Sequence, residues 1–251
     1  LQAYPPWRGG PWDELIEMSV DDRLEAVRGE RFSARLIDYA SKNDAIVAPE
    51  FIFPLGNKPK PNYVGGPKES LAAIAEKNQE HPAQTFIRMS CETDGRALFT
   101  LRALNRNLEA LSKAISADFC LPGLGDAGAH VSQIMDSGWT TFSISHWHRD
   151  AKVLSLEMVI QQLTSAPARV IGLKDRGVLA SGMKADINVI NLEQLSELMP
   201  EIAYDLPGGA KRFIQKAVGY RATICNGMII VDKDQHTGAR SGKVHRHRAQ
   251  T

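Results

Sequence analysis

The sequence predicts an α/β protein in two parts, an α/β body over residues 1–176 and a small β-rich part over residues 177–251. In the first part, amphipathic helical patterns alternate with short apolar runs that are typical of strands. After Gly177 the helical patterns give way to short strand-like runs. Between the last two of these runs stands Asn226-Gly227, the strongest short hairpin signal, because both positions of its tight turn require positive φ.

The helical patterns of the first part have identifiable ends. Ser155 stands where a helix-capping side chain is expected. Pro167 takes the favoured first position of a following helix, which Gly172 ends in a left-handed cap. In chain order, the expected helices lie at residues 12–40, 70–77, 82–87, 106–115, 154–163 and 167–172.

Two apolar runs of the first part predict strands, at residues 46–53 and, despite Pro122, at residues 119–124. A loop containing Trp139 is expected after the second strand. In the second part, a helical or irregular excursion over residues 192–219 interrupts the strands. Those strands are expected at residues 178–179, 185–190, 222–225 and 228–231.

The bulk composition is that of an ordinary globular protein, with 251 residues, 43% hydrophobic and 24% charged, and a net charge of +1. Neither nucleic acid nor a membrane surface is expected as a partner, because the charge is near neutral and the basic cluster at 243–248 is typical of a solvated terminus. Cys91, Cys120 and Cys225 form no CxxC pair, so neither a zinc knuckle nor a disulfide framework is indicated, and a reducing compartment, the cytoplasm, is favoured.

Asp126 is the leading candidate for a functional residue. It follows the apolar run that predicts a strand, and Gly125 and Gly128 flank it. We expect the glycines to let the backbone turn sharply, so that the carboxylate lies at the carboxyl end of a strand, where α/β folds keep their chemistry. An aspartate beside glycine is by itself more often only part of a turn.

Several stretches, in this order and spacing, resemble the amidohydrolase superfamily, and most of all its D-aminoacylase-like branch, the N-acyl-D-amino-acid deacylases. The resemblance is strong from residue 118 to the end of the chain and looser over residues 1–117. The stretches are GLGDAGAH at 123–130, LTSAPARVIGL at 163–173, DRGVL at 175–179, GMKADINVI at 182–190, GYRATICNG at 219–227 and TGARSGK at 237–243.

The resemblance implies a (β/α)8 barrel of the TIM type with a small β-sandwich built from both chain ends. This chain is similar to the carboxyl-terminal portion, with barrel strands seven and eight and part of the sandwich. Family members bind one or two divalent metals, typically zinc, through an HxH pair on the first strand and histidines on the fifth and sixth. Those positions have no counterpart in this sequence. We therefore expect the chain alone, without the N-terminal half of the barrel, to be inactive and to bind zinc only weakly.

The resemblance also implies a reaction, the hydrolysis of an amide C–N bond in a small-molecule N-acyl-(D-)amino acid. In it, Asp126 takes a proton from the attacking water and passes it to the leaving amine; direct contact of Asp126 with metal stays open. Two alternatives remain, a hydantoinase- or dihydropyrimidinase-like amidohydrolase and a truncated chain without catalysis. A homo-oligomer stays open as well.

The remaining candidates have more than one interpretation. His130 either binds substrate or bonds to a loop carbonyl. His146 and His148 form an HxH pair that would hold zinc on a strand, but a surface or supporting role is favoured because the pair follows Asp126 and leads into a helix. Cys120 is expected to be a small buried hydrophobe. Asp186 is expected to be structural.

Overall fold

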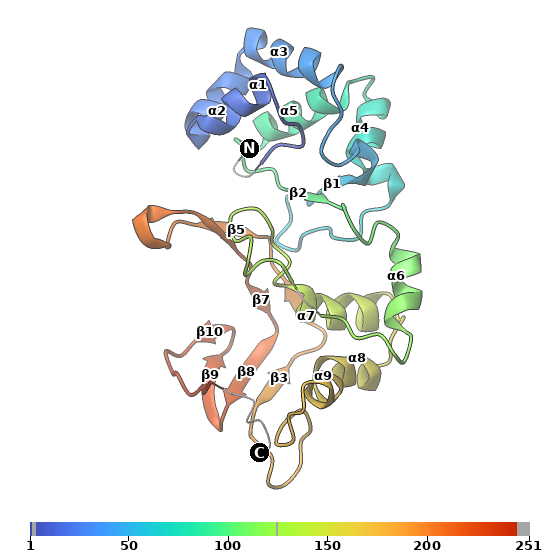
Figure 1. Cartoon of the computed structure of the whole chain (residues 1–251), viewed down its shortest axis with the longest axis vertical. Helices are drawn as coiled ribbons and strands as arrows, with labels where there is room; N and C mark the ends of the chain where they lie inside the picture. Colours follow the sequence, from blue (N-terminus) through green and yellow to red (C-terminus); the bar gives the residue numbers. More distant parts are fainter. Residues whose placement is uncertain (2–3, 124, 245–251) are drawn as a thin grey trace, which may run out of the picture. The chain divides into compact units, whose positions relative to one another are not determined.

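The computed structural model describes residues 1, 4–123 and 125–244 (Figure 1). By their contacts the residues form two compact units, which we call unit 1 and unit 2. Unit 1 comprises Leu1–Leu111, Ala129–Met135 and Met199–Ile214. Unit 2 comprises Ser112–Gly128, Asp136–Leu198 and Gln215–Thr251. The predicted division at residue 177 stays a prediction.

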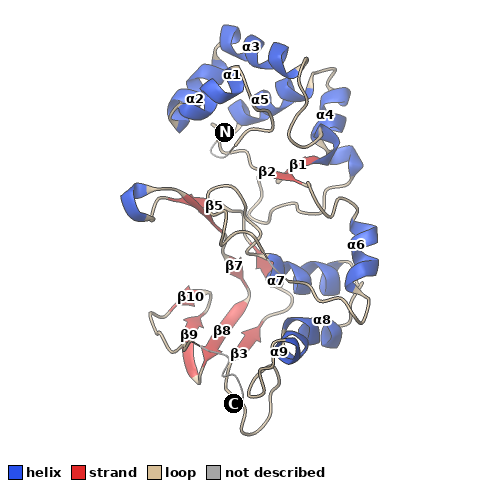
Figure 2. Cartoon of the chain, in the orientation of Figure 1, coloured by secondary structure: helices blue, strands red, loops and turns tan. Residues whose placement is uncertain are grey.

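Unit 1 is mainly helical, as the colouring of Figure 2 shows. Its helices are α1 (Pro11–Glu17), α2 (Val20–Arg28), α3 (Glu30–Ala40), α4 (Leu71–Lys77) and α5 (Pro82–Glu92). The single helical pattern predicted at 12–40 is divided into three helices, because Ser19 caps α2 by accepting a hydrogen bond from Asp22 N and Gly29 separates α2 from α3. The helices predicted at 70–77 and 82–87 are confirmed as α4 and α5.

The core of unit 1 is built around aromatic side chains. Trp7 stacks on Trp12 with ring centroids 5.2 Å apart, and Trp12 Nε1 donates a hydrogen bond of 3.1 Å to the carbonyl of Leu36. Trp12 and Leu36 are both fully buried. The buried indole therefore has its hydrogen-bond partner, as a polar group in an apolar core requires.

Two short antiparallel strand pairs complete unit 1. The strand β1 (Ile52–Pro54) pairs with β2 (Phe99–Leu101), and β5 (Glu201–Ala203) pairs with β6 (Arg212–Ile214). Most of the strand predicted at 46–53 is wrong, because Pro49 opens the 3-10 turn η1 (Pro49–Phe51). The pair β5–β6 lies where a helical or irregular excursion was predicted. Two further 3-10 turns are η2 (Pro67–Glu69) and η4 (Pro207–Gly209).

Helix α6 (Leu108–Ile115), which was predicted at 106–115, begins in unit 1 and ends in unit 2. The other helices of unit 2 follow it in the chain. They are α7 (Trp139–Phe142), the π-helix η3 (Ser143–Asp150), α8 (Leu156–Leu163) and α9 (Ser165–Val170). The loop predicted around Trp139 is wrong, because α7 and η3 form one continuous helical run. The Ser155 cap of α8 is confirmed, since its Oγ accepts a 3.1 Å hydrogen bond from Met158 N. Gly172 has the expected positive φ, but α9 begins two residues before Pro167.

Unit 2 also holds a four-stranded antiparallel sheet in the order β10 (Gln235–His236), β9 (Met228–Asp232), β8 (Tyr220–Cys225) and β3 (Ile187–Ile190). The predicted hairpin is confirmed, because Asn226 and Gly227 join β8 to β9 with φ of 49° and 79°. A second pair joins β4 (Ser196–Glu197) to β7 (Ala217–Val218). The strand predicted at 178–179 does not form.

The α/β class is confirmed, because both units combine helices with strands. Every strand pair in the part of the chain that the structure describes is antiparallel. The barrel portion and the sandwich therefore stay predictions. Within the described ranges, no helix has the length and apolarity needed to cross a membrane. Most of the predicted basic tail, from residue 245, lies outside the described residues.

Candidate functional site

The turn that carries Asp126 is held by a second aspartate, Asp136. The backbone N–H of Asp126 donates a 2.8 Å hydrogen bond to Oδ2 of Asp136, and the N–H of Ala127 donates a 2.9 Å bond to Oδ1. All three residues belong to unit 2. Because one carboxylate accepts both N–H groups, the backbone of Asp126 is fixed on two sides while its own exposed carboxylate remains available.

The approach to this turn differs from the prediction. The strand predicted at 119–124 is wrong, since its described residues are turn and irregular backbone, and Phe119 is 94% exposed. Pro122 lacks the N–H that a paired strand would need, and an apolar run forms a strand only where a neighbouring strand accepts its hydrogen bonds. Leu124 lies outside the described residues. Asp126 is therefore presented by a turn rather than by a strand end.

Gly125 is needed here for a close approach. A Cβ atom at this position would lie 2.9 Å from Oδ1 and 3.2 Å from Cγ of Asp136. Contacts this short require the carboxylate to move, so any larger residue would disturb the two hydrogen bonds that it accepts. Gly128 has no atom within 4 Å of its Cβ position. The flanking glycines thus have different roles, and only Gly125 makes room for Asp136.

His130 is exposed, and its carbonyl accepts hydrogen bonds of 2.9 Å from Gln133 N and Ile134 N. By its contacts it belongs to unit 1, whereas Asp126 belongs to unit 2. The predicted role of His130 in substrate binding stays a prediction.

The HxH pair lies on the π-helix η3 and not on a strand. The ring of His146 stacks on Phe142 with centroids 4.7 Å apart, whereas Nδ1 of His148 lies 3.0 Å from the carbonyl oxygen of Leu154. Residues two apart on a helix do not share a face. Each ring thus has its own structural partner, and the supporting role of the pair stays a prediction.

The last two candidates, Cys120 and Asp186, differ in how well the structure matches the prediction. Cys120 is half-buried and not fully enclosed, because the turn that contains it does not become a buried strand. Asp186 has the structural contacts expected of it. Its Oδ1 accepts a 2.8 Å hydrogen bond from Asn226 N, and its Oδ2 pairs with Nη1 of Arg176 at 3.0 Å.

A zinc site requires three or four nitrogen, sulfur or oxygen ligands around one point. Within the described ranges, no three histidine, cysteine, aspartate or glutamate side chains are grouped closely enough to hold a metal ion. The described residues therefore do not fit zinc by themselves.

The sequence interpretation missed a buried polar group in unit 2. The carboxylate of Glu197, which is 1% exposed, accepts a 3.2 Å hydrogen bond from Oγ of the fully buried Ser145. Oγ1 of Thr141 lies 2.8 Å from the hydroxyl of Tyr220, whose pKa is raised by burial. These contacts join α7 and η3 to β4 and β8. No sequence pattern signals them, because each joins residues more than fifty positions apart.

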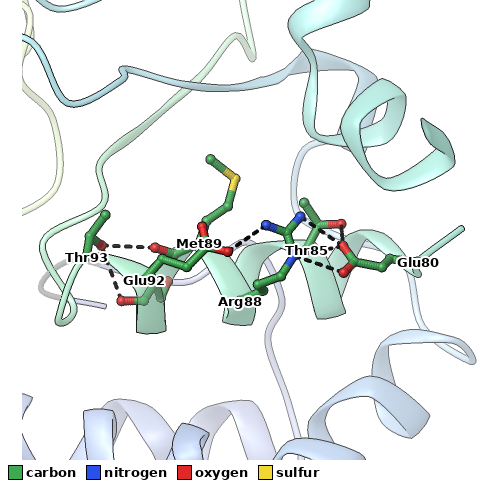
Figure 3. A network of polar contacts seen from close by, with 7 residues as sticks. Glu80, Thr85, Arg88, Met89, Glu92 and Thr93 are labelled. Carbon is green, nitrogen blue, oxygen red and sulfur yellow. Dashed lines mark hydrogen bonds and ion pairs between the residues drawn. The ribbon is translucent and has the colours of Figure 1, made fainter. Parts of the chain in front are cut away.

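A network of charged residues lies on α5 and, at Glu80, just before it, within unit 1, and has a structural role (Figure 3). Arg88 pairs with Glu80 through Nε at 2.9 Å and with Glu92 through Nη1 at 2.9 Å. Thr85 Oγ1 donates a 2.7 Å hydrogen bond to Glu80. The hydrogen bonds from Arg88, and next the one from Thr85, lower the pKa of Glu80 against the opposing effect of desolvation.

One comparison with known proteins covers the region that contains the Asp126 turn. A family model described as "Amidohydrolase family" matches residues 97–231. The N-acyl-D-glutamate deacylase of Alcaligenes xylosoxydans xylosoxydans is 38% identical over 61 residues, which cover 24% of this chain and 12% of that protein. The dihydroorotase of Lactobacillus gasseri is 38% identical over 50 residues, 20% of this chain and 12% of that protein.

Two solved structures are more distant. A D-aminoacylase mutant in complex with CuCl2 is 17% identical, with a TM-score of 0.45, over 86% of this chain and 46% of that one. The N-acyl-D-glutamate deacylase of Bordetella bronchiseptica, complexed with zinc and a phosphonate inhibitor, is 20% identical, with a TM-score of 0.37, over 81% and 43%. The matched segments thus span 12% of the curated relatives and less than half of the solved chains.

Proposed function

This chain belongs to the amidohydrolase family, and from that membership we propose that the enzyme containing it hydrolyses an amide C–N bond, with N-acyl-D-amino acids as substrates. The observation that carries the proposal is the family match over residues 97–231, which includes the Asp126 turn. The 38% identity with an N-acyl-D-glutamate deacylase supports this substrate class.

In the proposed reaction, Asp126 moves a proton. The oxygen of a water molecule forms a bond to the amide carbon, and the carboxylate of Asp126 takes the proton that the water loses. As the C–N bond breaks, Asp126 returns that proton to the leaving nitrogen. The exposed carboxylate on a backbone held by Asp136 supports this role, because a general base must be both accessible and fixed in position.

We further propose that this chain supplies the carboxyl-terminal portion of a barrel and part of a sandwich. The remaining part of the enzyme then supplies the N-terminal half of the barrel and the zinc ligands. When bound, zinc would polarise the amide and activate the water. The resemblance of residues 118–251 to the carboxyl-terminal portion of family members supports this proposal.

We also propose that the enzyme functions in a reducing compartment, the cytoplasm, a proposal that the three free cysteines support.

A second candidate function is the hydrolysis of a cyclic amide, in the manner of a dihydropyrimidinase or hydantoinase. The dihydroorotase relative supports it, because its identity over 50 residues equals that of the deacylase over 61. The two candidates share the proton transfer at Asp126 and differ in the bond that is broken. The third alternative is a truncated chain without catalysis. It predicts that neither an N-acyl-D-amino acid nor a cyclic amide is hydrolysed.

The experiment compares two proteins, this chain and the full reading frame that contains it, each supplied with ZnCl2. Amine release is measured from N-acetyl-D-glutamate and its L enantiomer, and ring opening is measured with dihydroorotate. We expect the longer protein to release amine from the D enantiomer and this chain alone to be inactive. Ring opening without amine release would favour the second candidate. Inactivity of the longer protein on all three would contradict both.

A further inference from the structure

Unit 2 contains a concave surface, which lies beside the β8–β9 turn and which we call the hairpin pocket. It is formed by residues 183–185, residues 226–228 and residues 240–243, and its volume is about 580 Å³. This volume lies within the range of roughly 300–1,000 Å³ that is typical of pockets for small molecules. Neither the proposed hydrolysis nor the Asp126 turn uses these residues.

The three segments of the hairpin pocket are fixed to one another by hydrogen bonds. Asn226 Nδ2 donates a 2.7 Å bond to the carbonyl of Ser241, and Ser241 Oγ donates a 2.7 Å bond to the carbonyl of Cys225. Gly227 N donates a 3.0 Å bond to the carbonyl of Ala185. Because each segment is hydrogen-bonded to another, the fold itself holds the concave surface in place.

The lining of the hairpin pocket is strongly cationic. Lys184, Arg240 and Lys243 line it, and none of the lining residues is a carboxylate. The formal charge of the lining is therefore +3, although the whole chain carries only +1. Within the described ranges, none of these three cations lies within 4.0 Å of a carboxylate oxygen in an ion pair. Their charge is thus available to a ligand.

Two acidic residues that adjoin the lining of the pocket, Asp175 and Asp186, are already engaged elsewhere. Asp186 pairs with Arg176 and accepts the hydrogen bond from Asn226 N. Asp175 also pairs with Arg176, at 3.1 Å, and this interaction lowers the pKa of Asp175 more than the neighbouring Lys184 does. The carboxylates beside the pocket therefore neutralise Arg176 first and leave the lining cations in excess.

We propose that the hairpin pocket binds a small molecule through its phosphate group. A phosphate carries up to two negative charges and three acceptor oxygens, which match several cations better than a single carboxylate does. Arg240 provides a planar donor pair for bidentate contact, and the two lysines provide point charges. The side chains of Met183 and Met228 give the same pocket an apolar surface for the rest of the ligand.

The experiment titrates pyrophosphate into the protein by calorimetry at two salt concentrations. In the pocket variant, Lys184→Gln, Arg240→Gln and Lys243→Gln remove three charges. The matched control, Arg169→Gln, Lys174→Gln and Arg221→Gln, removes the same charge from exposed positions of unit 2 outside the pocket. We expect pyrophosphate affinity to fall at least tenfold in the pocket variant and less than threefold in the control.

Two single variants keep the proposal testable if the triple variant folds poorly. Arg240→Gln is expected to weaken pyrophosphate binding severalfold, and Arg240→Lys to recover only part of the loss, because lysine keeps the charge but not the bidentate geometry. Equal weakening in the pocket and control variants would overturn the proposal, because binding would then follow net charge alone. Sulfate binding as tight as that of pyrophosphate, or no pyrophosphate binding, would also overturn it.

Discussion

Replacing Asp136 with asparagine removes one of the two oxygens that hold the Asp126 turn. The carboxylate accepts N–H groups from Asp126 at 2.8 Å and from Ala127 at 2.9 Å. The amide of asparagine has a single oxygen, so one backbone N–H loses its acceptor and faces the side-chain NH2 group. Hydrogen bonds to charged groups contribute about 1.5–3 kcal/mol each, and exposure reduces this. We expect the free energy of unfolding to fall by about 1–2 kcal/mol.

The same change is expected to slow the proposed reaction, because it loosens the backbone that positions the Asp126 carboxylate. A displacement of about 1 Å in a reacting group can lower the rate by about 10²-fold, so we expect kcat to fall between about tenfold and 10²-fold with little change in KM. Urea unfolding and steady-state kinetics of the whole enzyme measure both effects. The matched control is Asp118→Asn, which removes the same charge from an exposed position of unit 2.

Two results would refute this reasoning. One is an unfolding free energy for Asp136→Asn within about 0.5 kcal/mol of the parent, the range of ordinary surface substitutions. The other is a kcat equal to that of the Asp118→Asn control. Either would mean that the two hydrogen bonds do not determine where Asp126 lies.

Two further predictions concern stability. Because Arg88 lowers the pKa of Glu80, ionised Glu80 stabilises the fold above its unfolded pKa of about 4.3, and this contribution is lost as the pH falls through the lowered folded pKa. Glu80→Gln should therefore lower the free energy of unfolding by about 1 kcal/mol at neutral pH. The difference in stability between the variant and the parent should shrink near pH 3. Urea midpoints of the two proteins that differ equally at both pH values would contradict this. Gly227→Ala should lower the free energy of unfolding by about 1 kcal/mol, because the φ of Gly227 is 79°. Gly128→Ala should leave stability unchanged, because Gly128 has open space around its Cβ position and no left-handed φ. Equal melting temperatures for the two variants would contradict this.

The features that the sequence predicted well are set by local chemistry. The Ser155 cap and the Asn226-Gly227 turn each depend on side-chain or backbone preferences within a few residues. These preferences act in the same way whatever surrounds them, so the residues alone are enough to place α8 and the β8–β9 hairpin.

The features that the sequence missed depend on contacts between distant residues. The apolar run at 119–124 has the composition of a buried strand, yet Phe119 is exposed and the run turns. The support of Asp126 by Asp136 joins residues ten positions apart through backbone N–H groups, and no periodicity signals such a bond. The pair β5–β6 forms because Glu201–Ala203 meets Arg212–Ile214, although neither segment is strongly strand-like.

The most direct measurement of the central claim is the kcat of Asp126→Asn in the whole enzyme with an N-acyl-D-amino acid. Asparagine keeps the shape of the side chain and cannot carry the proton. General acid–base catalysis contributes about 10²- to 10⁴-fold, so kcat should fall by at least 10²-fold while KM changes little. The control is Asp186→Asn, which should lower stability more than kcat because Asp186 pairs with Arg176. A kcat for Asp126→Asn within about threefold of the parent would contradict the proton-transfer role.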